Sequence, residues 1–127
     1  MSINVPLAEL AQTIEPHPFA YLLTVGEGER VHAVAVDPVV EGDRLRVPQL
    51  GRRSLTNSQQ RTSVTLLWPP AQTGGYSLIV DGTAERSGDG VLVRPSRAVL
   101  HRPAAVSGEP VPSGDACGSD CVELPTG

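Results

Sequence analysis

The chain has 127 residues, which is enough for one domain with a single hydrophobic core. Its formal net charge of −4 argues against nucleic-acid and anionic-membrane partners. The apolar runs are too short to span a bilayer and no secretory leader is recognisable, so we expect a cytoplasmic protein with no membrane partner. Aromatic residues make up only 3% of the chain, so the core must consist mainly of aliphatic side chains.

The N-terminal segment predicts a short amphipathic helix. Asn4 is a residue type that caps helices, and apolar residues recur at helical spacing between Leu7 and Ile14. Pro16 and Pro18 end the pattern, because proline cannot continue a helix.

After residue 18 the apolar period changes to two, which indicates strands. The predicted strands cover residues 19–25, 30–36, 39–40, 44–47, 63–68, 76–85 and 91–100. Within them, Asp81-Gly82 predicts a β-bulge and Pro95 predicts a bend or a break. The polar stretch 51–61 predicts a short helix between two strands.

This succession predicts a small antiparallel β-barrel, in which closure of the sheet would remove exposed edges. An oligonucleotide-binding barrel would fit the number of strands, but the negative charge and the scarce aromatic residues argue against it.

We expect residues 1–103 to form the barrel domain and residues 104–127 to form a C-terminal tail rich in Pro, Gly and Ser. The tail holds both cysteines, Cys117 and Cys121, which could form a local disulfide or supply two metal ligands. No second Cys or His pair lies nearby in the sequence, so incidental thiols are the simpler interpretation and we predict no metal site.

The segment Arg52-Arg53-Ser54 carries the strongest functional signal. It places two guanidinium groups and a hydroxyl at the predicted start of the 51–61 helix. The unpaired N–H groups of a helix N-terminus attract anions, and arginine can hold a phosphate through two parallel hydrogen bonds. A solvated charge pair is the structural alternative. Because Leu55 is the only large apolar residue of this helix, packing alone does not explain the segment, and we predict a ligand that carries a phosphate.

The run from Val47 to Trp68 resembles part of the pyridoxamine 5′-phosphate oxidase-like family, the flavin-binding split barrels. In that family a strand leads into a Ser-Arg-Lys-type turn, a short helix and a strand of the form Val-x-Leu-x-Phe/Trp. Here Arg52-Arg53-Ser54 and Val64-Thr65-Leu66-Leu67-Trp68 occupy those places. The resemblance covers roughly residues 5–103 and implies a mainly β fold, a small antiparallel split β-barrel with a short N-terminal helix and one short helix between strands.

The resemblance also implies a cofactor, FMN, held in a groove between the subunits of a homodimer. The cofactor-binding residues that it implies are Arg52, Arg53 and Ser54 at the phosphate, the backbone of His32, Ala33 and Val34 at the isoalloxazine ring, and Val47, Pro48 and Gln49 at a strand end. A packed histidine at a strand end is an equal interpretation of His32. An enzyme of this kind would be a flavin- or deazaflavin-dependent oxidoreductase, and its substrate is unknown.

Several positions depart from the family pattern. The lysine of the turn is absent, Pro48 stands where a hydroxyl or aromatic residue is common, and His32 or Arg30 replaces an arginine that contacts phosphate. The C-terminal substrate-binding segment of the true oxidases is also missing. We therefore do not expect pyridoxamine phosphate oxidase activity, and a deazaflavin cofactor, or none, stays open.

The alternative function is a non-catalytic split-barrel module that has lost flavin and binds another small ligand or a protein partner. No Ser/His/Asp order and no pair of carboxylates stands out in the sequence. The sequence therefore assigns no catalytic residue, and whether the protein is an enzyme stays open.

Overall fold

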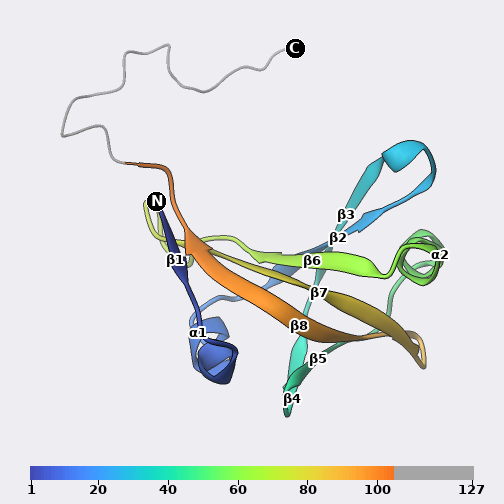
Figure 1. Cartoon of the computed structure of the whole chain (residues 1–127), viewed down its shortest axis with the longest axis horizontal. Helices are drawn as coiled ribbons and strands as arrows, with labels where there is room; N and C mark the ends of the chain where they lie inside the picture. Colours follow the sequence, from blue (N-terminus) through green and yellow to red (C-terminus); the bar gives the residue numbers. More distant parts are fainter. Residues whose placement is uncertain (105–127) are drawn as a thin grey trace.

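The computed structural model describes residues 1–104, and Cys117 and Cys121 lie outside this range with nearly all of the predicted tail. The strands are β1 Ser2–Asn4, β2 Ala20–Val25, β3 Val31–Val36, β4 Val39–Glu41, β5 Arg44–Val47, β6 Ser63–Trp68, β7 Ser77–Ser87 and β8 Gly90–His101. The helices are the 3-10 turns η1 Leu7–Glu9 and η2 Glu27–Glu29 and the α-helices α1 Leu10–Ile14 and α2 Arg52–Gln60. Figure 1 shows the long β7–β8 hairpin crossing the molecule, with α1 towards one end and α2 towards the other.

The strands form one antiparallel sheet in the order β3-β2-β6-β7-β8-β5-β4, with β1 also paired to β8. This confirms the prediction of a mainly β, antiparallel split barrel. The predicted closure of the sheet is wrong, because β3 and β4 lie at opposite ends of the strand order. Only Asp37 and Pro38 separate these two strands, and a proline holds the preceding residue extended. The chain therefore continues from the β3 edge of the sheet to the β4 edge, and β4 does not turn back to pair with β3.

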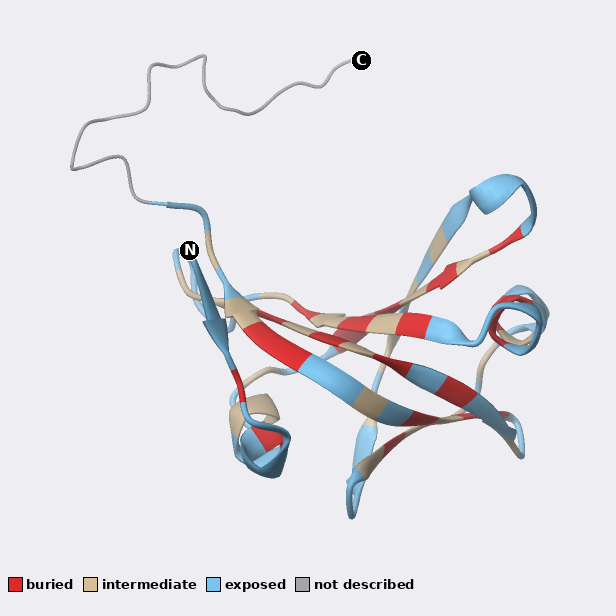
Figure 2. Cartoon of the chain, viewed as in Figure 1, coloured by how far each residue is buried: buried red, intermediate tan, exposed pale blue. Residues whose placement is uncertain are grey.

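The core lies on the inward face of the sheet. Buried residues alternate along β2, β6 and the first half of β7, which Figure 2 shows as red bands on the ribbon. Leu22, Leu66 and Leu78 are 0% exposed at the centre of this face. Trp68 is 1% exposed and belongs to the core.

The N-terminal helix differs from the prediction in two ways. Asn4 does not cap it but ends β1, where it lies opposite Val99 of β8. The helix is also divided, because the 3-10 turn Leu7–Glu9 precedes the five-residue α1. Pairing with β8 holds Asn4 extended, and this tertiary contact overrides its local preference for capping. Of the predicted apolar face, Leu10 is buried, whereas Leu7 is 45% exposed.

The predicted bulge at Asp81-Gly82 is confirmed, and the last strand does not break at Pro95. Asp81 lies opposite Arg97 and Gly82 lies opposite Pro95, which leaves Ser96 as the extra residue of β8. The Ser96 hydroxyl donates a hydrogen bond to the Asp81 carbonyl oxygen at 3.1 Å. With this irregular step, β8 pairs along its length with β7 on one side and with β5 and β1 on the other.

Candidate functional site

The candidate site is built on the N-terminal end of α2. Gly51 is the N-cap residue, with a φ of −76° and a ψ of 174°, and no side chain caps the helix. The first turn contains no acidic side chain, so its N–H groups keep their attraction for an anion. Arg52 and Arg53, the first two helical residues, are both exposed. Two guanidinium groups therefore lie where the helix itself favours negative charge.

A polar hollow of about 970 Å³ lies between η2, the start of β3 and α2. The residues that line this polar hollow are Gly26, Glu27, Arg30, Val31, His32, Arg52, Arg53, Thr56, Asn57 and Gln60. Its charged residues are three arginines and one glutamate, so the hollow is positively charged. Thr56, Asn57 and Gln60 follow Arg53 at helical spacing and form one polar face of α2.

A second hollow of about 630 Å³ runs along β3, and we call it the edge hollow because β3 is an edge strand. The residues that line the edge hollow are Phe19, His32, Val34, Ala35, Val36, Asp37, Pro48, Gln49, Leu50, Gly51, Arg52, Arg53 and Ser54. Three of them, His32, Arg52 and Arg53, also line the polar hollow. The two hollows therefore meet at these residues, one with apolar walls and the other with polar walls.

Two residues of the edge hollow have features that the protein alone does not explain. Ser54 is only 2% exposed, and its hydroxyl makes no hydrogen bond to any group of residues 1–104. Leaving a buried hydroxyl without a partner costs about 1–3 kcal/mol. Gln49 has a φ of 60°, in the left-handed region that residues other than glycine rarely adopt. Unusual backbone of this kind clusters at ligand sites, and both features fit a hollow that binds a ligand.

The arginines of the site also lack protein partners. Within residues 1–104, the side chains of Arg30, Arg52 and Arg53 form no ion pair and no hydrogen bond. By contrast, Arg46 holds the Glu41 carboxylate through two nitrogen atoms, at 2.7 and 3.0 Å. Unpaired guanidinium groups around one hollow repel one another and so favour the entry of an anion.

The structure brings together seven of the nine residues that the resemblance implies, namely Arg52, Arg53, Ser54, His32, Val34, Pro48 and Gln49. Ala33, whose implied contact is through its backbone, is exposed on β3, and Val47 is fully buried in the core; neither is a lining residue of the two hollows. The lining residues that the sequence analysis misses include Phe19, Thr56, Asn57 and Gln60. Helical spacing from Arg53 is a signal that could have found the last three.

No helix among residues 1–104 is long and apolar enough to cross a membrane. The same residues contain no group of three or more His, Cys, Asp or Glu side chains that could hold a metal ion. Of the histidines, His17 contacts the Pro69 carbonyl oxygen through Nδ1 at 2.9 Å, and His101 contacts the Ser2 hydroxyl through Nδ1 at 3.2 Å. His32 is the histidine that lines the two hollows.

Comparison with known proteins gives two close relatives. The uncharacterized proteins Mb0449c of Mycobacterium bovis and MT0457 of Mycobacterium tuberculosis are each 44% identical to this chain over 135 residues. The aligned region covers 94% of this chain and 94% of each relative. No protein-family model matches the chain.

Solved structures share the fold. A FAD-binding protein of Mesorhizobium loti has a TM-score of 0.59 at 13% identity, over 79% of this chain and 96% of that protein. A protein named F420 reductase has a TM-score of 0.58 at 16% identity, over 68% and 94%. A Listeria innocua protein named as a candidate pyridoxamine 5′-phosphate oxidase has a TM-score of 0.54 at 16% identity, over 72% and 92%. At these identities the similarity establishes the fold alone.

Proposed function

We propose that this chain binds a flavin-type cofactor. It belongs to the same family as the two mycobacterial proteins. It also has the fold of the pyridoxamine 5′-phosphate oxidase-like split barrels. The cofactor we propose is FMN, with its phosphate at Arg52, Arg53 and Ser54 and its ring in the edge hollow. A deazaflavin is the alternative within the same class, since proteins of this fold are named both as FAD-binding and as F420 reductase.

The observation that carries this proposal is the junction of the two hollows at Arg52 and Arg53. A flavin combines a flat, largely apolar ring with an anionic tail, and the two hollows differ in the same way. Phe19 and Val34 give the edge hollow apolar walls, whereas arginines dominate the charge of the polar hollow. The unpartnered Ser54 hydroxyl would donate a hydrogen bond to a phosphate oxygen. Charge-assisted bonds from the guanidinium groups and the N–H groups of α2 would hold the same phosphate.

The bound cofactor would supply redox chemistry, so the proposed class of activity is that of an oxidoreductase. The residues of this chain would bind and orient the cofactor. Pro48 and Gln49 line the edge hollow together with residues of β3, and Gln49 has its left-handed backbone shortly before Gly51, the N-cap of α2. His32, where the hollows meet, would lie between the ring and its tail.

We also propose that the protein is a cytoplasmic homodimer. Tyr21 and Leu23 of β2, Leu67 of β6 and Ile79 of β7 alternate with core residues, so they face outward, and they are only half-buried. Tyr21 lies opposite Leu67, which in turn lies opposite Ile79, so these residues form an apolar outer strip across three strands. A second copy of the chain would bury this outer strip. Residues 1–104 contain no cysteine, which suits a reducing compartment.

The test is a titration of the purified full-length protein with FMN, FAD and a deazaflavin, followed by the absorbance and fluorescence of the cofactor. We expect saturable binding of one of them, weakened at least about tenfold by Arg53→Ala. Arg44→Ala is the matched control, because Arg44 lines neither hollow and its loss should leave the affinity unchanged. Equal affinities of the two variants would exclude the proposed phosphate site. Binding of none of the three cofactors would overturn the flavin proposal in favour of the non-catalytic module.

A further inference from the structure

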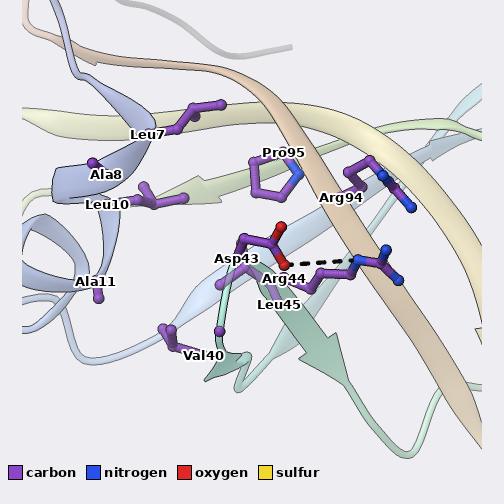
Figure 3. A pocket seen from close by; sticks show the side chains of 11 residues that line it. Leu7, Ala8, Leu10, Ala11, Val40, Asp43, Arg44, Leu45, Arg94 and Pro95 are labelled. Carbon is purple, nitrogen blue, oxygen red and sulfur yellow. Dashed lines mark ion pairs between the residues drawn. The ribbon is translucent and has the colours of Figure 1, made fainter.

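A third hollow of about 460 Å³ lies between η1 and α1, the β4–β5 turn and β8 (Figure 3). We call it the α1 hollow. It shares no lining residue with the polar hollow or the edge hollow, so it is a separate feature of the molecule. Its volume falls within the range of about 300–1,000 Å³ that is typical of small-molecule sites.

The side of the α1 hollow next to the helix is apolar. Leu7 and Val40 line it and are 45% and 39% exposed, although both are large aliphatic side chains. Leu10 and Leu45 also line it but belong to the buried core, at 6% and 1% exposed. The hollow therefore joins the core to exposed apolar surface, and an apolar ligand seated there would remove that surface from water.

Two arginines lie on the opposite side of this hollow, away from α1 (Figure 3). The pairing of Leu45 with Val93 sets Arg44 of β5 beside Arg94 of β8. In Figure 3 both side chains extend in the same direction, with their guanidinium groups on the same side of the hollow. Like charges opposite one another destabilise a sheet, so this arrangement costs free energy unless an anion offsets it.

The protein itself offers these arginines little compensation. The Arg44 Nε atom is 3.9 Å from Asp43 Oδ1, which is too long for a hydrogen bond. The Asp43 side chain is also 92% exposed. The side chain of Arg94 forms no ion pair or hydrogen bond within the part of the chain that the structure describes. Arg46, two residues along β5, holds Glu41 through two nitrogen atoms instead. Within the described residues, Arg44 and Arg94 therefore lack the close carboxylate partner that Arg46 has.

We propose that the α1 hollow binds an amphipathic carboxylate, a small molecule with an aliphatic body and one carboxylate group. The carboxylate accepts hydrogen bonds from Arg44 and Arg94, and the aliphatic body lies against Leu7 and Val40. Two guanidinium groups and the Asp43 carboxylate leave a net positive charge, which selects an anion. No aromatic side chain lines the hollow to stack on a ring, and its hydrophobic walls match an aliphatic chain.

Decanoate is the probe, and decanol, which has the same apolar chain without the charge, is its comparison ligand. We expect calorimetry on the full-length protein to show saturable binding of decanoate below its micelle concentration. Decanol should bind at least about tenfold more weakly, because it cannot form the charge-assisted bonds. Arg44→Gln and Arg94→Gln should each weaken decanoate binding by about tenfold and leave decanol binding unchanged. Leu7→Asn should weaken the binding of both ligands.

Arg53→Gln is the matched control, because it removes an exposed arginine that lines the other two hollows. Its affinity for decanoate should equal that of the wild type. Arg44, Arg94 and Leu7 all lie outside the buried core, so these variants should fold, and an unchanged urea midpoint would verify it. Three results would overturn the proposal: no saturable binding of decanoate, equal binding of decanoate and decanol, or loss of decanoate binding in Arg53→Gln in place of Arg44→Gln.

Discussion

The side-chain amide of Asn57 donates a hydrogen bond to the Thr24 hydroxyl at 3.1 Å and thereby ties α2 to β2. Thr24 is 0% and Asn57 is 7% exposed, so water cannot readily replace either partner. Gly26 leaves room for this contact, because a Cβ at that position would lie 2.9 Å from Asn57 Oδ1. The positions of Arg52 and Arg53 at the start of α2 therefore depend on a polar contact one turn further along the helix.

Thr24→Val keeps the shape of the side chain but leaves the Asn57 amide buried without its acceptor. We expect the free energy of unfolding, measured by urea denaturation, to fall by about 1–3 kcal/mol. Thr83→Val is the control, because Thr83 is exposed on β7 and its hydroxyl makes no hydrogen bond within residues 1–104. Adding Asn57→Leu to Thr24→Val should cost less than the sum of the single changes, since both polar partners are then gone. Strictly additive losses would contradict the coupling.

Gly82 is required by close packing at the bulge. A Cβ there would lie 2.6 Å from the Arg94 carbonyl oxygen and 2.8 Å from Val93 Cγ1. Neither the backbone nor a buried valine can yield easily, so Gly82→Ala should lower the free energy of unfolding by about 1–3 kcal/mol. Thr83→Ala, at the next and exposed position, should change it by less than about 0.5 kcal/mol. Thermal and urea unfolding of the two variants measure the difference, and equal losses would show that the strands are not this close.

Leu66 and Leu67 are neighbours on opposite faces of β6. Leu66 is 0% exposed in the core, so Leu66→Ala should lower the free energy of unfolding by about 2–5 kcal/mol.

Leu67 belongs to the outer strip and lies opposite Tyr21 and Ile79. If the strip is the dimer interface, Leu67→Glu should convert a dimer into a folded monomer, because it would bury an unpaired charge between the subunits. Sedimentation velocity with circular dichroism tests this, and a dimer that persists in Leu67→Glu would place the interface elsewhere.

Local patterns predict some strands of this fold better than others. The regular alternation in β5 and β6 fixes their bounds, Arg44–Val47 and Ser63–Trp68, because one face of each strand is buried. β1 gives no such pattern, since Ser2–Asn4 are all exposed and are held as a strand only by pairing with β8. The bulge is signalled by Asp81-Gly82, but its extra residue, Ser96, lies on the partner strand. A sequence reveals periodicity within one strand and not the register between two.

The same limit applies to the candidate site. The role of Arg52 and Arg53 is predictable, because the N–H groups of the helix start and the two guanidinium groups attract the same anion. Asn57 is harder to identify, since a polar residue on a polar helix gives no sign that it is buried. Gly26 and Glu27 come from the β2–β3 connection, and only the packing of α2 on β2 brings them to the polar hollow. Spacing along the chain predicts neighbours within an element but not the contacts between elements.

The pair formed by Glu41 and Arg46 on the β4–β5 hairpin predicts a pH dependence. The hydrogen bonds from Arg46, together with its charge, hold the pKa of the Glu41 carboxyl below its ordinary value. The folded-state pKa is thus lower than the unfolded one, so the stabilisation is complete above the unfolded pKa and is lost as the pH falls through the folded pKa. Glu41→Gln should therefore narrow the difference in free energy of unfolding between about pH 7 and about pH 3.

This effect should be small and should shrink further in high salt, because the two side chains are 38% and 44% exposed. Glu85→Gln is the matched control, since Glu85 is exposed and forms no ion pair within residues 1–104. Urea denaturation across the pH range measures the difference for each variant. If the wild-type and Glu41→Gln curves run parallel at every pH, the pair seen in the hairpin does not contribute to stability in solution. If the two curves converge as the pH falls, the ionised Glu41 carboxylate is the source of the stabilisation, as its lowered pKa requires.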